Sequence, residues 1–269
     1  YDVSSLENQL GEIAKSWRDG FREVLLRNFD DESGNRIIEK YSDVFPAGYR
    51  EAFSPENAAS DIAYIESLSE KRALEMSFYR PHGAPRDVIG FKLFRPEQTV
   101  PLSDVVPMLE NMGLRVIGEQ PYSITFADAS RVWINDFSMT YSKEPTFEVE
   151  EVKTIFQEAF NKIWSGDAEN DGFNRLVLEA QLNWREISML RGYAKYLKQA
   201  GFIYSPEYIA ETLVSHASIT HLLKDFFAYR FDPETHKDTE LNIQKTVKLI
   251  EKMLDDVAML DEDRILRRY

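Results

Sequence analysis

The sequence predicts an α+β fold in which a small α/β sandwich is flanked by mainly helical regions. Near both ends of the chain, apolar residues recur at three- and four-residue spacing, as on amphipathic helices. From Leu74 to Met139 the apolar period falls to two in four short segments, which is typical of strands half buried in a sheet. After Gly166 the helical period returns, so we expect the sandwich to end there.

The N-terminal region, residues 1–57, is predicted to be helical. Its first helix is long and amphipathic with a nearly seven-residue repeat, and the acidic segment 30–35 is expected to end it. Pro46 stops the second helix, because proline cannot continue a helix interior. The third has a hydroxyl cap followed by proline at the first helical position. The expected helices begin at Ser4, Arg36 and Ser54, and the last two end at Phe45 and Leu68.

The central region, residues 58–166, is predicted to run strand, strand, helix, strand, strand, helix. The first two strands are close enough to form a hairpin, and Gly113 ends the first helix. Moving the first strand to the end gives the ferredoxin-like order, so we expect a circularly permuted ββαββα sandwich. Strands are expected at 74–78, 89–93, from 114 and at 132–139, helices at 103–113 and 149–164, and an added strand at 123–126 is left open.

The C-terminal region, residues 167–269, has the clearest helix boundaries. A capping-box pair, Asn183 and Glu186, begins one helix, and Gly201 ends it. Ser205 and Pro206 start the next helix, so the two must pack as neighbours. A further helix is expected over 216–231, with Ile219, Leu222, Leu223, Phe226 and Phe227 buried, and a last heptad-like helix from Ile243 to the end of the chain.

Composition narrows the classes of function. The 269 residues include 32 Lys and Arg against 46 Asp and Glu, which gives a net charge of −14, and no basic patch stands out. We therefore expect no nucleic-acid partner. Without cysteine there are no disulfides, thiolate metal sites or thiol nucleophiles. No apolar run approaches the roughly 20 residues that span a bilayer, so we expect no membrane partner and a cytoplasmic location.

Motifs for metal or cofactor chemistry are weak. Asp167, Glu169 and Asp171 imitate the start of a calcium loop, but the twelfth loop position is Leu178 instead of a bidentate acid. An acidic helix N-terminus is therefore the better interpretation. His216 and His221 are five residues apart and point to different helix faces, so a zinc pair is improbable. There is no glycine-rich nucleotide loop. We expect neither catalytic, metal nor cofactor-binding residues here.

One candidate site for a regulatory ligand consists of Ser103 and Asp104. The loop 96–102 precedes the helix that they begin, and free backbone N–H groups there suit a small anion such as an amino-acid carboxylate. The alternative is that Ser103 simply caps its own helix.

Several segments together resemble the large bacterial NAD-specific glutamate dehydrogenases, and the resemblance extends over most of the chain. Each is a long, ordered stretch instead of an isolated motif. They are PMLENMGLRV at 107–116, EQPY at 119–122, VWIxDF at 132–137, AENDGFNRLV at 168–177 and YLxQAGF at 196–202, with further matches at 41–49 and 78–81.

The resemblance implies a long cytoplasmic homo-oligomeric enzyme that converts L-glutamate and NAD to 2-oxoglutarate and ammonia. It implies that this chain is the piece upstream of the catalytic core, with an ACT-like module and a helical connection. The start at Tyr1 and the end at Tyr269 inside a helical pattern agree with a piece of a longer polypeptide. The family's catalytic Lys and Asp and its dinucleotide loop then lie beyond Tyr269, and no residue here matches them.

The predicted function is thus a non-catalytic regulatory and linker segment, which binds no NAD itself and docks on its own catalytic core and on other subunits. ACT modules commonly bind an amino acid beside a glycine in the loop before a helix. The loop 96–102 has no glycine, which favours a packing role. Two alternatives are an amino-acid-sensing module and a structural oligomerisation module built on the terminal helices.

Overall fold

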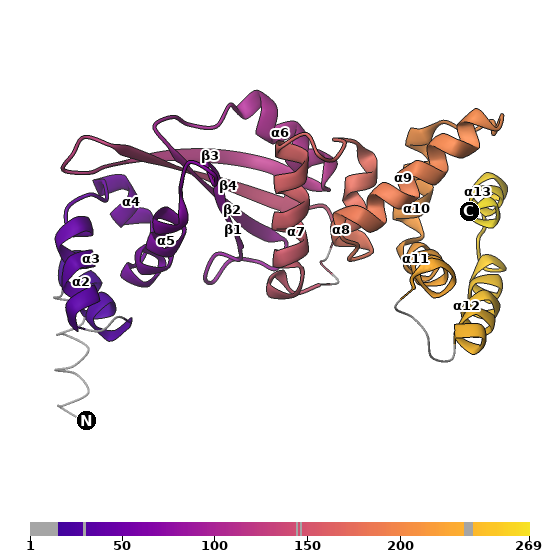
Figure 1. The fold of residues 1–269 in the computed structure, drawn as a ribbon, viewed down its shortest axis with the longest axis horizontal. Helices are drawn as coiled ribbons and strands as arrows, with labels where there is room; N and C mark the ends of the chain where they lie inside the picture. The colour runs from indigo at the N-terminus through magenta and orange to yellow at the C-terminus, as the bar shows by residue number, and fades with distance from the viewer. Residues whose placement is uncertain (1–15, 29–30, 144, 146, 234–238) are drawn as a thin grey trace. The chain divides into compact units, whose positions relative to one another are not determined.

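The computed structural model describes residues 16–28, 31–143, 145, 147–233 and 239–269 (Figure 1). By internal contacts the chain divides into two compact units, which are described separately. The first comprises Tyr1–Ser77, Gly90–Pro101 and Gly118–Ser138, and the second comprises Phe78–Ile89, Leu102–Ile117 and Met139–Tyr269.

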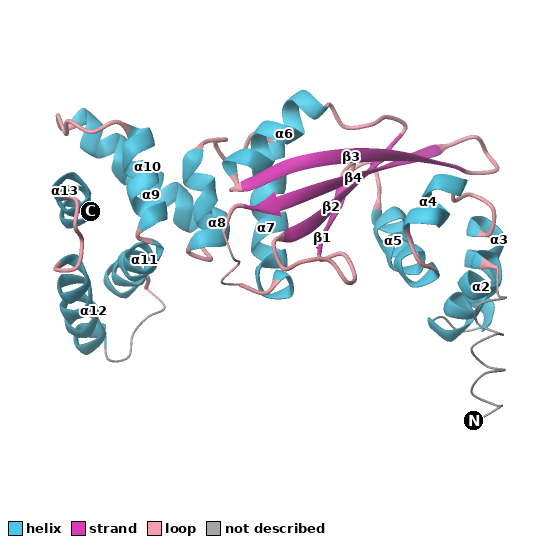
Figure 2. Ribbon diagram, turned by 180° about the vertical axis from the view of Figure 1, so that it is seen from behind, coloured by secondary structure: helices cyan, strands magenta, loops and turns pink. Residues whose placement is uncertain are grey.

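The strands form one four-stranded antiparallel sheet in the order β1-β2-β4-β3 (Figure 2). This confirms the predicted α+β class and the predicted neighbours β1 and β2. The segment 123–126, left open above, is mainly the end of β3. Pro121 is tolerated inside β3 because this strand lies at an edge of the sheet. The strands are β1 (Glu75–Tyr79), β2 (Val88–Pro96), β3 (Leu114–Thr125) and β4 (Arg131–Tyr141).

The helices of the first unit pack around an aromatic core. Phe21, Phe45 and Tyr49 are nearly or fully buried, and the Tyr49 ring meets Tyr122 edge to face at 5.4 Å between centroids. As predicted, Ser54 caps α5, its side chain accepting from the Asn57 N–H at 3.4 Å. The helices are α2 (Trp17–Asn28), α3 (Asp31–Tyr41), α4 (Ala47–Ala52) and α5 (Pro55–Ser67).

The bounds expected for the second helix were wrong. The second helix was expected at 36–45, but α3 begins at Asp31 and ends at Tyr41, and the short helix α4 follows Pro46. The helix α2 ends at Asn28, next to the acidic segment as expected, but acidic residues of that segment begin α3, because negative charge is favourable in the first turn of a helix. The expected start of the first helix at Ser4 lies outside the described residues.

The first unit also contains a buried ion pair. The Lys92 ammonium lies 2.5 Å from a carboxylate oxygen of Asp61, and the Tyr49 hydroxyl donates to the same oxygen at 2.5 Å. The Asp61 and Lys92 side chains are 5% and 3% exposed. Burial raises the pKa of Asp61, against the lowering effect of Lys92. The Lys92 ammonium also lies 3.6 Å from the centre of the Phe53 ring.

The second unit contains the two helices of the predicted sandwich. The helix α7 (Val149–Trp164) has the predicted bounds and packs on β1, where Phe156 stacks on Phe78 at 4.0 Å between centroids. The Phe78 N–H donates to the Gln157 side chain at 3.0 Å. The helix α6 (Leu102–Asn111) ends before Gly113, whose φ of 89° is the left-handed conformation that glycine adopts at lowest cost.

The remaining helices of this unit confirm the predicted boundaries around α9. The Asn183 side chain accepts from the Arg185 and Glu186 N–H groups, while the Glu186 side chain accepts from the Asn183 N–H, which forms the capping box. Gly201, at φ 87°, ends the helix. The elements are η1 (Gly172–Arg175), α8 (Leu176–Glu179), α9 (Trp184–Gln199), α10 (Pro206–Ser215), α11 (Ala217–Phe231), α12 (Thr239–Leu254) and α13 (Leu260–Arg268).

The last helix was expected to continue to the chain end, which is wrong, because α12 ends at Leu254 and α13 begins at Leu260. Asp255 and Asp256 follow α12 directly, where negative charge opposes the helix dipole. Five residues of α11 were expected to be buried. Ile219 is buried, whereas the other four are only half-buried. Among the described helices, none is long and apolar enough to cross a membrane.

Candidate functional site

At the predicted ligand site, Ser103 and Asp104, few polar groups point towards a common position. Ser103 and Asp104 are exposed in the first turn of α6, and the Ser103 hydroxyl lies 3.3 Å from the Asp104 carboxylate. The helix begins at Leu102, so the alternative that Ser103 caps it is wrong. In the loop before it, the Gln98 N–H donates to the Pro96 carbonyl at 2.8 Å and the Val100 N–H donates to the Asn135 side chain at 3.3 Å. A role for Ser103 and Asp104 in ligand binding stays a prediction.

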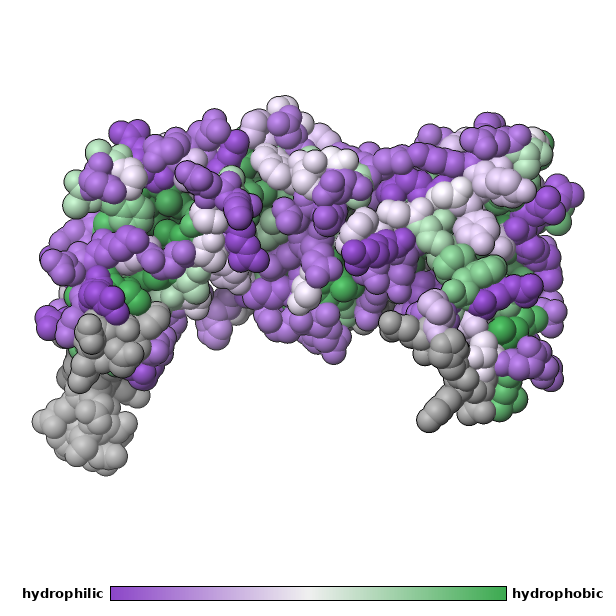
Figure 3. All heavy atoms as spheres, viewed as in Figure 1, coloured by the Kyte–Doolittle hydropathy of each residue, from purple (hydrophilic) through white to green (hydrophobic). Residues whose placement is uncertain are grey.

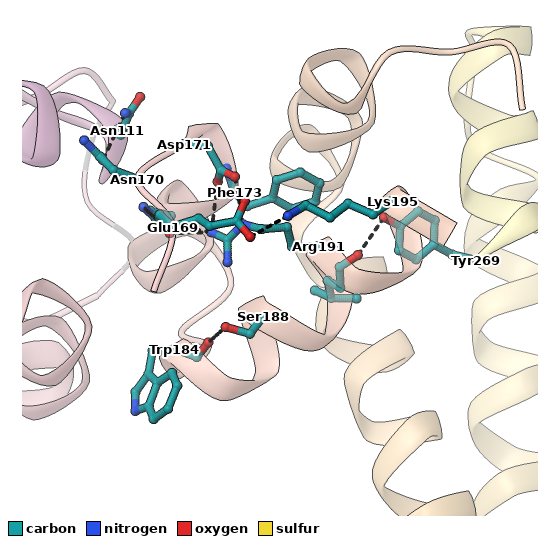
Figure 4. Close-up of polar contacts among 12 residues, drawn as sticks. Asn111, Glu169, Asn170, Asp171, Phe173, Trp184, Ser188, Arg191, Lys195 and Tyr269 are labelled. Carbon is teal, nitrogen blue, oxygen red and sulfur yellow. Dashed lines mark hydrogen bonds and ion pairs between the residues drawn. The ribbon is translucent and has the colours of Figure 1, made fainter. Parts of the chain in front are cut away.

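A polar cluster around Arg191 on α9 has a more definite geometry (Figure 4). The Arg191 side chain is only 5% exposed, and its guanidinium binds the Asp171 carboxylate through Nε at 2.7 Å and Nη2 at 2.9 Å. Nη2 also donates to the Asn174 side chain at 2.8 Å. This two-point contact with a carboxylate fixes the orientation of both side chains.

The segment before α8 folds around this guanidinium. The Asp171 side chain accepts from the Phe173 N–H at 3.1 Å, which caps the short helix η1. The Asn174 amide donates to the Glu169 carbonyl at 2.9 Å, and Arg191 approaches the same carbonyl at 3.4 Å. The buried Arg191 therefore organises the backbone of the segment that leads through the short helix η1 into α8.

Each acid of the calcium-like pattern faces a cation of the protein itself. Asp167 pairs with Lys162 at 2.9 Å, Glu169 pairs with Lys195 at 2.5 Å, and Asp171 pairs with Arg191. Lys162 and a side-chain hydrogen bond from Ser165 lower the pKa of Asp167. Within the described ranges, no group of three or more His, Asp and Glu residues is arranged to hold a metal ion.

The two C-terminal histidines have separate partners. One imidazole nitrogen of His216 lies 2.9 Å from the Glu262 carboxylate, while His221 Nδ1 lies 2.9 Å from the Ala180 carbonyl oxygen. His216 therefore contacts α13, and His221 contacts the segment that follows α8.

A hollow of about 460 Å³ lies beside this cluster, and we call it the α9 hollow. It is lined on one side by the segment 166–169 and on the other by the residues of α9, which are Ser188, Arg191, Gly192 and Lys195. Sequence reasoning noticed the acids but missed their basic partners. The signal was present, because Arg191 and Lys195 are four residues apart and so lie on one face of the helix.

Comparison with known families identifies the parts of the chain. Residues 73–152, which include the whole sheet, match the family model described as "Glutamate dehydrogenase, ACT3 domain". Residues 24–68 match "Glutamate dehydrogenase, helical motif 2", and residues 168–233 match "Glutamate dehydrogenase, helical motif 3". The chain thus contains an ACT domain with a helical motif before it and another after it in the sequence.

The chain belongs to the glutamate dehydrogenase family, as the resemblance indicated. Proteins named NAD-specific glutamate dehydrogenase from Halomonas elongata and Pseudomonas aeruginosa are 44% and 41% identical to it over its full length. One from Mycobacterium tuberculosis is 33% identical over 98% of the chain. The chain spans 17% of the length of the first two relatives and 16% of the third.

Proposed function

We propose that this chain is a non-catalytic regulatory and linker segment of an NAD-dependent glutamate dehydrogenase. One observation carries the proposal: the matched family regions are an ACT domain and two helical motifs, in an alignment that covers the full chain with relatives of that name. The contacts of the Arg191 guanidinium with Asp171 and Asn174 are consistent with a structural role, because they hold the segment before α8 against α9.

The parent protein would convert L-glutamate and NAD to 2-oxoglutarate and ammonia in the cytoplasm. In this proposal NAD belongs to the parent's catalytic core and is not bound by residues 1–269. The chain would comprise a helical region at 1–57, the ACT-like domain at 58–166 and a helical domain at 167–269 that leads towards the core.

We also infer that the ACT domain is a circularly permuted ferredoxin-like sandwich. The sheet order β1-β2-β4-β3 supports this. If β1 is counted as the last strand, then β2, β3, β4 and β1 become strands one to four of a βαββαβ unit. The sheet order is then four, one, three, two, and strands one and three lie at its centre.

The helical domain is proposed to dock on the missing core and on other subunits. Large apolar side chains are exposed there, including Ile203 at 77%, Leu260 at 62% and Phe231 at 58%. In the face drawn in Figure 3, apolar residues interrupt a mostly hydrophilic surface. If these side chains mediate self-association, light scattering will detect dimers or larger species of the purified chain. If the chain remains monomeric at high concentration, these side chains do not mediate self-association, and the docking proposal is then limited to contacts with other parts of the parent protein.

The proposal is tested by an activity assay of the purified 269-residue chain. With L-glutamate and NAD we expect no formation of NADH above the rate without protein, because the catalytic groups are proposed to lie elsewhere. A relative with its full length serves as the positive control under the same conditions. Glutamate-dependent NADH formation by the purified chain would refute the proposal.

A further inference from the structure

The α9 hollow has the size of a small-molecule site and an unusual distribution of charge. Its volume of about 460 Å³ lies within the range of about 300–1,000 Å³ for ligand pockets. Two cations, Arg191 and Lys195, and two carboxylates, Asp167 and Glu169, line it. A site with both signs of charge suits a ligand that itself carries both signs.

The positive side combines a fixed cation with an adjustable one. Arg191 is held by Asp171 and Asn174 through Nε and Nη2, and among the described residues its Nη1 has no hydrogen-bond acceptor. Lys195 is 54% exposed on a flexible stem. A ligand carboxylate at this wall would gain charge-assisted hydrogen bonds without disturbing the buried contacts of Arg191.

The negative side is formed by the carboxylates of Asp167 and Glu169, which are each 56% exposed. Glu169 pairs with Lys195 at 2.5 Å, and Figure 4 draws the two side chains side by side. An exposed ion pair of this kind contributes little to stability, about 0–1 kcal/mol. A ligand with its own ammonium and carboxylate can therefore replace the Glu169–Lys195 pair with one contact to each of these side chains. The protein loses little stability in the exchange.

Gly192 lines the hollow and adds no side chain to it. It lies in the interior of α9, where glycine is less favourable than alanine because of its backbone entropy. Nothing lies within 4 Å of a Cβ built at this position, and no positive φ requires glycine here. Packing and backbone conformation do not explain the residue, whereas an open ligand site beside the helix does.

We propose that the α9 hollow binds a small zwitterionic α-amino acid. Its carboxylate faces Arg191 and Lys195, and its ammonium group faces Glu169 and Asp167. This site lies apart in sequence from Ser103 and Asp104 and is independent of them. The inference does not depend on the parent's activity, so its failure would leave the proposed function standing.

The test is isothermal titration calorimetry of the 269-residue chain with each of the twenty L-amino acids and with inorganic phosphate. We expect at least one amino acid to bind. The matching amine without the carboxylate and the matching acid without the ammonium should each bind at least about tenfold more weakly, as expected for loss of a charged hydrogen bond.

Variants locate the binding. Lys195→Met and Glu169→Gln should each weaken affinity about tenfold, and Gly192→Leu should abolish binding, while Lys198→Met on the same helix should leave it unchanged. Gly192→Ala should raise Tm by about 1–4 °C, because alanine stabilises a helix interior. That result shows that the position tolerates a side chain.

Three results would overturn the proposal. The first is that no amino acid binds, and the second is that phosphate or the deaminated acid binds as tightly as the amino acid. The third is binding that survives Gly192→Leu and is lost in Asp104→Asn, which would assign the ligand to the start of α6.

Discussion

Replacing Lys92 with Met is expected to lower the free energy of unfolding by about 3–5 kcal/mol, since it leaves the Asp61 carboxylate buried without its cation. Tyr49 continues to donate to Asp61, but one hydrogen bond does not offset the desolvation of a charge. Urea unfolding of the purified chain, followed by circular dichroism, measures the change.

The pH dependence of this variant has a definite sign. Burial raises the pKa of Asp61 in the folded protein and Lys92 opposes this, so without Lys92 the folded variant holds the carboxyl proton of Asp61 more tightly than the unfolded chain does. Protonation of Asp61 therefore stabilises the folded variant at pH values below the pKa of Asp61 in the unfolded chain. This stabilisation is lost as the pH rises through the pKa of Asp61 in the folded protein. The defect of Lys92→Met should be smaller at pH 5 than at pH 8.

The double variant Asp61→Leu with Lys92→Met is the matched control. It removes both charges, so it should recover most of the stability that the single variant loses. A single variant that unfolds at the wild-type urea concentration at both pH values would show that the Asp61–Lys92 pair does not hold the first unit together.

Replacing Arg191 with Met should cost about 2–3 kcal/mol of stability and loosen the segment 169–175. We expect less than for Lys92 because Asp171 is 35% exposed and water can solvate it. Arg191→Lys should recover only part of the loss, since an ammonium cannot reproduce the two-point contact. Urea unfolding and amide hydrogen exchange of residues 169–175 measure both effects.

Lys195→Met is the control for Arg191→Met. It removes a cation from the same helix, but its partner Glu169 is exposed, so the change should be below about 1 kcal/mol. Equal effects of the two variants would contradict the organising role of Arg191.

Much of the fold was predictable where local chemistry determines it. The capping box of Asn183 and Glu186, the left-handed Gly201 and the bounds of α7 are set by interactions within a few residues. The errors at α3 and α12 concern acidic residues, whose effect depends on whether they fall at the start or the end of a helix. Sequence alone does not decide that position.

The polar cluster was harder to predict because its partners are distant in the chain. Asp171 and Arg191 are twenty residues apart, and the pairing depends on how the segment before α8 turns back along α9. The acids resembled a calcium loop in sequence, and only tertiary contacts reveal that protein cations face them. For the same reason, sequence reasoning favoured Ser103 and Asp104, whose proposed role depended only on neighbours in the chain.

The central claim, that this chain serves an enzyme without carrying its chemistry, is tested most directly by titrating the purified chain with NAD in a calorimeter. The account predicts no heat of binding up to millimolar NAD, while a full-length relative binds under the same conditions. Saturable, stoichiometric binding of NAD to residues 1–269 would contradict it.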